Sequence, residues 1–438
     1  MRRTELERRA FLGLVGSLLA GAGTGCEALR GEAVPETPLW VHRPNGALSI
    51  VFRRLVTDKT KIKDEAYERG RPAIDVNHMR LFVGSQDGGL YAIDARTGDT
   101  LWRFNTRGPV QCEPLYDPEE DVVYFGSTDG ALYKVRAQDG KMLFRFSSSS
   151  EISRSPVISG ETVFFVNAND TLVAIARGTG KLKWYQARTP AFGIEISGYA
   201  GCAVGDGRVI TAFSDGSVMA YATSDGAEQW PSVDLSLDAQ SRDGQPPQYL
   251  DADTTPILAT VNAPGNPSTG GVILAHFEGG IHALEASSGR SLWSNTEATG
   301  VNHLLLWDQP AHRGRPRPNG SVGPDAPERR VIIASSGRTG LWGIDPDTGT
   351  TLWRNKLPEG GISAPVAISG AILVTTTRYG IFLFEPTSGG MIDGIAPGNE
   401  IAMTPAAYGQ HAYVMTNGGE LIGLLVSPPI TLPKKKPA

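Results

Sequence analysis

The sequence predicts an all-β fold, an eight-bladed β-propeller of four-stranded antiparallel blades. The first observation is a repeat in which a turn glycine is followed four residues later by an aromatic residue. Successive turn glycines are 42, 40, 46, 63, 60 and 40 residues apart, and a period near 40 is typical of propeller blades. The second observation is that short apolar runs alternate with glycine-containing turns. The repeat residues are Gly98 and Trp102, Gly140 and Phe144, Gly180 and Trp184, Gly226 and Trp230, Gly289 and Trp293, Gly349 and Trp353, and Gly389.

One repeat illustrates how the pattern predicts strands. Residues 81–83 form a short apolar run of strand-forming side chains, and residues 86–89 form a tight glycine turn. Residues 90–94 give a second strand and residues 100–104 a third, joined by the turn that ends at Gly98. The segment before each repeat supplies a fourth strand, so each repeat predicts one four-stranded blade.

The number of blades depends on how the two ends of the chain are used. Seven repeats carry the turn glycine, and an eighth, which begins at residue 404, stops one strand short. Residues 48–52 could supply the missing strand, which would close the ring and remove open sheet edges. We expect eight blades closed by this N-terminal strand, with seven as the alternative. We also expect each repeat tryptophan to pack between neighbouring blades.

Residues 1–26 have the pattern of an export signal. Arg8 and Arg9 precede an apolar, glycine- and alanine-rich run that is too short for a permanent membrane span. The paired arginines resemble a twin-arginine signal, and a general export signal is the alternative. Small residues before Cys26 resemble a lipoprotein cleavage site, so we expect Cys26 to carry a lipid. Because Glu27 follows, we expect an outer-membrane anchor that faces the periplasm.

The rest of the chain divides into three parts. Residues 27–46 form a linker, residues 47–426 the propeller, and residues 427–438 a basic tail. Two polar stretches, residues 234–248 and 313–330, interrupt the repeats, and we expect both to be loops.

The chain lacks the common catalytic motifs. It has no HExxH, Walker loop, CxxC or nucleophile elbow, so we expect no enzymatic activity, no cofactor and no metal. His276 and His282 flank a glycine turn, where surface decoration is a simpler interpretation than a metal site. Cys112 and Cys202 fall two blades apart, too far for a disulfide. With a formal net charge of −5, a nucleic-acid partner is not expected.

The repeat text resembles the quinoprotein-dehydrogenase (PQQ-like) repeat, and over residues 40–426 it is most similar to the BamB family. Members of that family are eight-bladed, lipid-anchored and non-enzymatic, and they bind periplasmic domains of BamA, the barrel-forming subunit of the outer-membrane assembly machinery. Residues 250–256 resemble the family's Asp-x-Asp-Thr-Thr-Pro segment, and residues 194–198 stand where the family has Leu-x-Leu-Arg-Gly.

The resemblance implies a partner-binding surface on these two segments. Ile194 and Ile196 keep the apolar pair, whereas Ser197 replaces the family's arginine and removes a charge-assisted contact. Asp251 and Asp253 would place carboxylates beside this apolar anchor. Alternatively, the two aspartates cap the turn that leads into an inner strand.

Three functions follow from these features. The first is a scaffold that acts as a monomer within the barrel-assembly complex, bound to a BamA-like protein. The second is a periplasmic ligand-binding or sensor propeller, which the two insertions and Ser197 favour. The third is a quinone-dependent dehydrogenase, against which the absence of adjacent cysteines argues.

Overall fold

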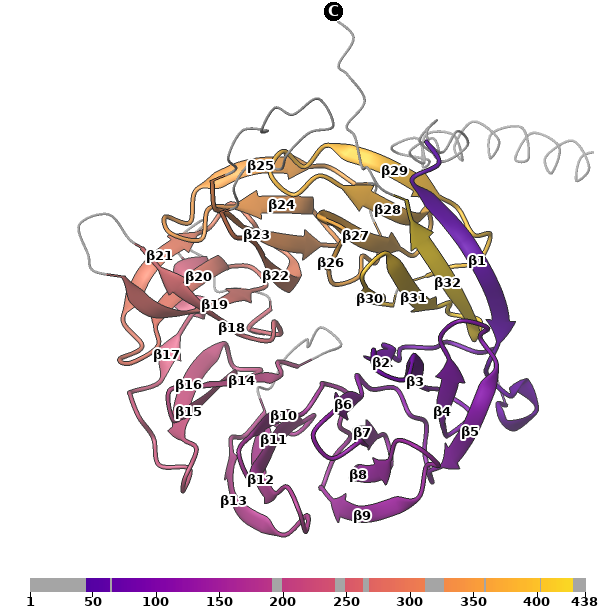
Figure 1. Cartoon of the computed structure of the whole chain (residues 1–438). Coiled ribbons are helices and arrows are strands. Elements are labelled where there is room, and N and C mark those ends of the chain that lie inside the picture. The colour runs from indigo at the N-terminus through magenta and orange to yellow at the C-terminus, as the bar shows by residue number, and fades with distance from the viewer. Residues whose placement is uncertain are drawn as a thin grey trace, which may run out of the picture. The chain divides into compact units, whose positions relative to one another are not determined.

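The computed structural model shows a ring of eight four-stranded antiparallel sheets, so the prediction of an eight-bladed propeller is confirmed and the seven-bladed alternative is wrong (Figure 1). The ring lies within a compact unit that spans Trp40–Ala438. Nearly all regular structure in the described residues is β. The structure describes residues 45–63, 65–190, 199–240, 249–262, 268–311, 327–357, 360–401 and 403–427.

Blades 1 to 4 each run from an innermost to an outermost strand in chain order. Their strands are β2 (Ala73–Asp75), β3 (Arg80–Gly84), β4 (Gly89–Asp94) and β5 (Thr100–Asn105); β6 (Leu115–Asp117), β7 (Val122–Ser127), β8 (Ala131–Arg136) and β9 (Met142–Ser147); β10 (Val157–Ser159), β11 (Thr162–Asn167), β12 (Thr171–Ala176) and β13 (Leu182–Ala187); and β14 (Cys202–Gly205), β15 (Arg208–Ala212), β16 (Ser217–Ala222) and β17 (Val233–Asp234).

Blades 5 to 7 repeat this order, and blade 8 takes its outermost strand from the N-terminal side of the ring. Their strands are β18 (Ile257–Val261), β19 (Thr269–His276), β20 (Gly280–Glu285) and β21 (Ser291–Asn295); β22 (Val301–Gln309), β23 (Arg329–Ser336), β24 (Gly340–Ile344) and β25 (Thr351–Asn355); β26 (Val366–Ile368), β27 (Ala371–Thr376), β28 (Gly380–Phe384) and β29 (Met391–Ile395); and β30 (Ala406–Tyr408), β31 (His411–Met415), β32 (Glu420–Val426) and β1 (Leu48–Leu55).

The ring is closed by β1, which pairs antiparallel with β32 from Leu48 opposite Val426 to Leu55 opposite Glu420. The expected closing strand at residues 48–52 is therefore confirmed, and it extends three residues further. Figure 1 shows β1 lying along the outside of β32, where the two ends of the propeller sequence meet. This pairing satisfies the backbone groups that an open last blade would leave exposed.

The repeat glycine and tryptophan form a contact between successive blades. Trp102 lies against Gly140 of the next blade, where an added Cβ would come within 2.7 Å of the indole Cε3. The indole Nε1 also donates to the carbonyl of Ala137 at 3.0 Å. Gly140 has a φ of +70°, so both its conformation and its neighbour require glycine. The same aromatic-to-glycine packing recurs for Phe144 and Gly180, Trp184 and Gly226, Trp230 and Gly289, Trp293 and Gly349, and Trp353 and Gly389.

The closing blade replaces this contact in two ways. Gly98 of blade 1 packs against Phe52 of β1, whose ring takes the place of a repeat aromatic. Asp393 stands where the last repeat loses its aromatic residue, and its carboxylate accepts hydrogen bonds from the N–H groups of Asn45 at 2.6 Å and Leu48 at 2.8 Å. In place of the repeat aromatic residue, the Asp393 carboxylate therefore holds the start of β1 by hydrogen bonds.

The hydrophobic core is divided among the interfaces between blades. Eight buried clusters occur in the described residues, and each joins side chains of two neighbouring blades. In one of them, Phe82 and Ala92 of blade 1 pack with Val123 and Tyr133 of blade 2. Because each sheet covers its faces with its neighbours, stability comes from the complete ring.

The two faces of the ring carry different loops. One face carries the connections between blades and the turns between the second and third strands of each blade. A connection and a turn are in contact there, for example where the Thr128 N–H donates to the Pro109 carbonyl at 3.0 Å. We call it the connection face. The opposite face, the turn face, carries the repeat-glycine turns, where the Ala95 N–H donates to the Met79 carbonyl at 2.8 Å.

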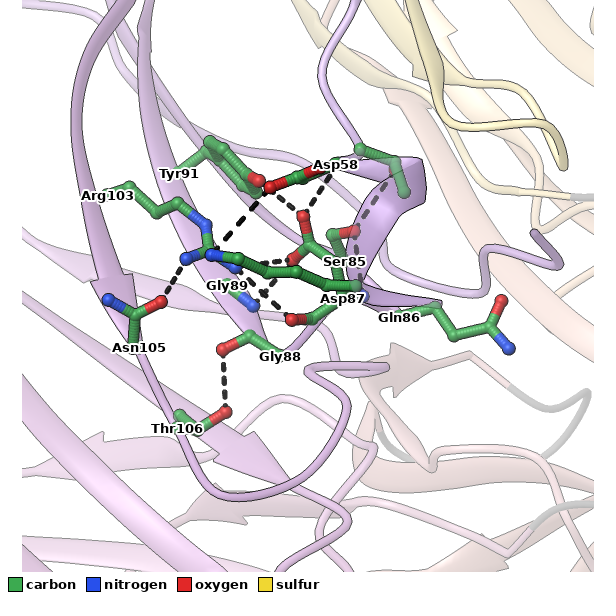
Figure 2. A network of polar contacts seen from close by, with 12 residues as sticks. Asp58, Ser85, Gln86, Asp87, Gly88, Gly89, Tyr91, Arg103, Asn105 and Thr106 are labelled. Atoms are coloured by element: carbon green, nitrogen blue, oxygen red, sulfur yellow. Dashed lines mark hydrogen bonds and ion pairs between the residues drawn. The ribbon is translucent and has the colours of Figure 1, made fainter. Parts of the chain in front are cut away.

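A polar network at blade 1 fixes the chain that follows β1 (Figure 2). The Asp87 carboxylate accepts hydrogen bonds from the N–H groups of Gly89 and Asp58, both at 2.8 Å, and from the Arg103 guanidinium at 3.0 Å. The Tyr91 hydroxyl also donates to it. Asp58 is the N-cap of the short helix η2 (Lys59–Lys61), so the network ties this segment to the first blade.

Three local expectations need correction or refinement. His276 and His282 are both buried, so their interpretation as surface decoration is wrong. They occupy β19 and β20, where the sheet packs against blade 4 and leaves no exposed face. In the stretch 234–248, predicted to be a loop, the first residue ends β17 and residues Ser236–Gln240 form the helix α2. In the stretch 313–330, the last two residues already belong to β23.

No helix among the described residues is long and apolar enough to cross a membrane.

Candidate functional site

The two predicted docking segments are described to different extents. Ile194, Ile196 and Ser197 fall within residues 191–198, which lie outside the described residues, as does Cys26. Tyr199 follows the first segment directly and is described. The second segment is described from Tyr249 onward, where it leads into β18 on the connection face.

Asp251 and Asp253 lie on this second segment, and both side chains are buried. The Asp251 carbonyl accepts a hydrogen bond from the Phe277 N–H at 3.1 Å, which ties the connection to the β19–β20 turn. Next to it, the Thr254 hydroxyl donates to the Ala275 carbonyl at 3.2 Å and accepts from the Ala275 N–H at 2.7 Å. Their burial favours turn-capping over direct contact for the two carboxylates, whereas the exposed Thr255 and the neighbouring loops remain accessible.

Arg154 joins Tyr199, the residue after the first predicted segment, to the second predicted segment. Its Nε donates to the Tyr199 carbonyl at 2.6 Å, and its Nη2 donates to the Asp253 carbonyl at 3.3 Å. Its Nη1 lies 3.7 Å from Oε1 of Glu113. One guanidinium, with its donors in a rigid planar fork, therefore joins the connections that enter blades 2, 3, 4 and 5.

The Tyr199 side chain strengthens this junction. Its hydroxyl accepts a hydrogen bond from the Ser153 N–H at 2.5 Å and donates to the Glu151 carbonyl at 3.2 Å. Tyr199 is buried, and burial raises the pKa of its phenol, so the hydroxyl stays protonated and keeps its donor role. Tyr199 is thus fixed to the connection that carries Arg154.

An aromatic platform lies on the same face beside the second segment. Tyr249 meets Phe277 edge to face, with ring centroids 5.3 Å apart, and the Arg338 guanidinium lies 5.8 Å from the centre of the Phe277 ring. Tyr249 belongs to the connection that enters blade 5, and the other two residues lie in turns of blades 5 and 6. Both rings are partly exposed and Arg338 is exposed. Partly exposed aromatic residues beside an arginine are the composition typical of interface hot spots.

Two arginines lie near a histidine beside this junction. Burial and the nearby charges of Arg154 and Arg71 together lower the pKa of His303 to about 3, so this imidazole is neutral at physiological pH. His303 sits just after an irregularity in the pairing of β22 with β23. His303 therefore adds no positive charge beside the two arginines.

A cavity of about 630 Å³ lies beside Glu113, between the innermost strands of blades 2 and 3. Leu115, Val157 and Ile158 form its apolar wall, and Arg177 with Asp117 forms a polar part. Cys202 also lines it, and Cys112 lies buried nearby in the chain; both are free thiols whose pKa burial raises to about 12. These thiols are protonated at neutral pH and are not nucleophiles.

One group of possible metal ligands occurs in the described residues: Asp75, His78 and Asp121, on the turn face. The Arg80 guanidinium lies inside this group, with its Nε donating to Asp75 at 2.8 Å and Nη2 contacting Asp121. Arginine thus already supplies the positive charge that the two carboxylates require.

Sequence reasoning missed the residues that organise this face: Arg154, Tyr199, Tyr249, Phe277 and Arg338. One signal was available for Arg154, because it precedes the Ser-Pro pair of its blade at the position that Thr254 holds before Thr255-Pro256. At this position blade 3 has an arginine where blade 5 has the smaller Thr254.

Comparison with protein families gives one extended match. A family model described as "Outer membrane protein assembly factor BamB" matches residues 59–119, 86–312 and 337–427. Among curated proteins, the outer membrane protein assembly factor BamB of Burkholderia pseudomallei is 23% identical over 299 residues, which cover 67% of this chain and 68% of that protein.

Comparison with solved structures shows the same fold in proteins of different kinds. BamB from Moraxella catarrhalis matches 86% of this chain and 99% of its own with a TM-score of 0.65 and 17% identity. A quinohemoprotein alcohol dehydrogenase from Comamonas testosteroni matches 89% of this chain and 78% of its own with a TM-score of 0.63 and 12% identity. At such identities the likeness shows the propeller fold alone.

Proposed function

This chain belongs to the family of outer membrane protein assembly factor BamB, and from this membership we propose that it is a non-enzymatic scaffold of the barrel-assembly machinery. The proposed partner is the periplasmic part of a BamA-like protein, which docks on the connection face. The chain acts as a monomer within that complex. It is held by a lipid on Cys26 at the periplasmic face of the outer membrane.

One observation carries the proposal: Arg154 joins Tyr199, the residue that follows the first predicted segment, to Asp253 of the 250–256 segment. Residues 194–198 and 250–256 are the two segments that the family resemblance assigns to partner binding. Because one side chain holds the described connections beside them, this part of the surface is preorganised, which lowers the entropy cost of association.

The exposed groups of that surface are suited to binding a protein partner rather than to catalysing a reaction. Tyr249 and Phe277 supply partly exposed apolar area, and Arg338 supplies a cation beside them. Ser197 removes the arginine that the family has in the first segment, so Arg338 becomes the cation available on the described part of this surface. The docked region of the partner then needs an apolar patch with a carboxylate nearby.

Co-purification from detergent-solubilised membranes tests the proposal. The wild-type chain is expected to retain a BamA-like subunit, and the double variant Phe277→Ala/Arg338→Glu is expected to lose it. Arg136→Glu provides a matched control, because Arg136 is an exposed arginine on the turn face that pairs with Asp139. Equal recovery with both variants would contradict docking at the connection face.

A ligand-binding or sensor propeller is the second candidate, favoured by the 630 Å³ cavity beside Glu113. Such a protein would gain thermal stability from a small ligand and would purify without a barrel-assembly subunit. A quinone-dependent dehydrogenase would instead show a visible absorbance band of the quinone in the purified protein. Neither outcome is expected from the scaffold.

A further inference from the structure

The outer rim of the propeller is unevenly apolar. Eight of the thirteen large hydrophobic side chains exposed in the described residues lie on β1, β5, β9 and β13, the outermost strands of blades 8, 1, 2 and 3. The outermost strands of blades 4 to 7 contribute only Leu352 among the described residues. Figure 1 shows that β1, β5, β9 and β13 form one continuous arc of the circumference. We call this arc the apolar rim; its main residues are Val51, Leu55, Leu101, Leu143, Leu182 and Tyr185.

The charge of the apolar rim also differs from that of the rest of the protein. The four strands contain five arginine or lysine residues and no aspartate or glutamate, in a chain whose net charge is −5. Carboxylates of neighbouring turns pair with the arginines, for example Asp99 with Arg54 at 3.6 Å. Exposed lysines lie next to the exposed apolar residues of blades 2 and 3: Lys141 precedes Met142, and Lys181 and Lys183 flank Leu182.

We propose that the apolar rim is a peripheral membrane contact that rests on a phospholipid leaflet containing anionic headgroups. Aliphatic side chains next to flexible lysines suit a lipid surface, since the aliphatic groups reach the acyl boundary while the ammonium groups pair with phosphates. Tyr185 adds an amphipathic ring of the type enriched at membrane interfaces. Exposed apolar patches of this kind mark either membrane or protein contacts, and the flanking lysines favour anionic lipid.

The route of the chain supports the same occupant. The N-terminal segment enters the ring at Leu48, the first residue of β1, so the propeller is reached from this rim. If Cys26 carries the proposed lipid, the 21 intervening residues (27–47) span at most about 75 Å when extended. A tether of that length keeps the rim at high local concentration near the leaflet. The contact is separate from the connection face, so its test requires no protein partner.

Vesicle flotation of residues 40–438 tests the proposal without the signal segment and without Cys26. This piece holds all eight sheets and all eight clusters between blades, so it retains the closed ring. We expect binding to vesicles of phosphatidylethanolamine and phosphatidylglycerol, weaker binding to pure phosphatidylcholine vesicles, and weakening by salt.

The variants Leu143→Glu and Leu352→Glu form a matched pair. Both leucines are three residues after the repeat glycine of their blade, and they are 50% and 49% exposed. Leu143→Glu is expected to lower partitioning onto the anionic vesicles about tenfold, because it removes an apolar contact and adds a repelled charge. Leu352→Glu, on blade 6, is expected to change it less than about twofold.

Three results would overturn the proposal. The first is that the wild-type piece fails to float with anionic vesicles at low salt. The second is an equal loss for both variants, which would mean that any added charge suffices. The third is vesicle-free self-association that Leu143→Glu abolishes, which would assign the rim to a second copy of the chain.

Discussion

The guanidinium of Arg154 donates a hydrogen bond to the carbonyl oxygen of Asp253 across 3.3 Å, although the two residues are 99 positions apart in the chain. The same guanidinium donates to Tyr199 at 2.6 Å. An arginine on the connection that enters blade 3 therefore sets the positions of the connections that enter blades 4 and 5. The proposed docking surface depends on this side chain more than on the carboxylates within it.

Replacing Arg154 with alanine is expected to destabilise the fold and to disorganise the connection face. The change leaves two buried carbonyl groups without their charged donor, and we expect a loss of about 2–3 kcal/mol in the free energy of unfolding. Urea denaturation measures it. Arg136→Ala, which removes an exposed ion pair on the turn face, is expected to have little effect. A loss of similar size in both variants would contradict the special role of Arg154.

Gly140→Ala tests the contact between successive blades. The added Cβ would lie 2.7 Å from the Trp102 ring, and the alanine backbone would have to adopt a φ of +70°. We expect destabilisation of about 3 kcal/mol or more, since overpacking and backbone strain add. Gly160→Ala is the control, because Gly160 has a φ of +52° with no atom within 4 Å. It should cost about 1–2 kcal/mol from strain alone, and equal losses would show that the tryptophan contact is irrelevant.

Much of the fold was predictable because the relevant signals are local and periodic. The turn glycine recurs in seven blades and its aromatic residue in six of them, so the repeat and the inter-blade packing of Trp102 followed from spacing. The role of Asp393 could not be predicted from spacing, since its partners Asn45 and Leu48 lie at the other end of the chain. A residue that departs from the repeat is recognised only when its distant partner is known.

The candidate site was less predictable for the same reason. Arg154 acts on backbone carbonyls, which every residue has, so its partners leave no sequence signature. The family resemblance predicted a partner-binding role for residues 250–256, but it could not indicate that the side chains of Asp251 and Asp253 are buried. His276 and His282 were interpreted as surface groups because they flank the Glu278-Gly279-Gly280 turn.

Phe52→Ala tests the closure of the ring. The ring of Phe52 packs on Gly98 and Gly423, and its loss leaves a cavity between blades 8 and 1. We expect destabilisation of about 3 kcal/mol and faster proteolysis at the N-terminal side of the propeller. Leu55→Ala, at an exposed position of the same strand, is expected to change stability by less than about 0.5 kcal/mol. Unchanged stability in Phe52→Ala would mean that β1 is dispensable.

The buried His276 predicts a pH dependence of stability. Burial, with a smaller contribution from neighbouring His282, lowers its pKa from 6.5 to about 4. Between pH 6.5 and 4 the unfolded chain therefore binds a proton that the folded chain rejects, so stability falls as the pH falls. From pH 7.5 to 5 this group is expected to remove about 2 kcal/mol.

His276→Asn should reduce that loss, because the amide oxygen can still accept the Gly279 N–H hydrogen bond, which is 2.8 Å long at the Nδ1 of His276, but does not titrate. Urea unfolding at the two pH values gives the difference. The exposed His411→Asn serves as the control variant. If both variants keep the wild-type slope, His276 does not carry this pH dependence.

The central claim is that the connection face docks a barrel-assembly subunit, and affinity measurement with the purified periplasmic domains of a BamA-like protein tests it most directly. The wild-type propeller is expected to bind, with Phe277→Ala/Arg338→Glu weakening the affinity at least about tenfold and Arg136→Glu leaving it unchanged. Absence of binding by the wild-type protein, or equal affinity of the two variants, would contradict the account.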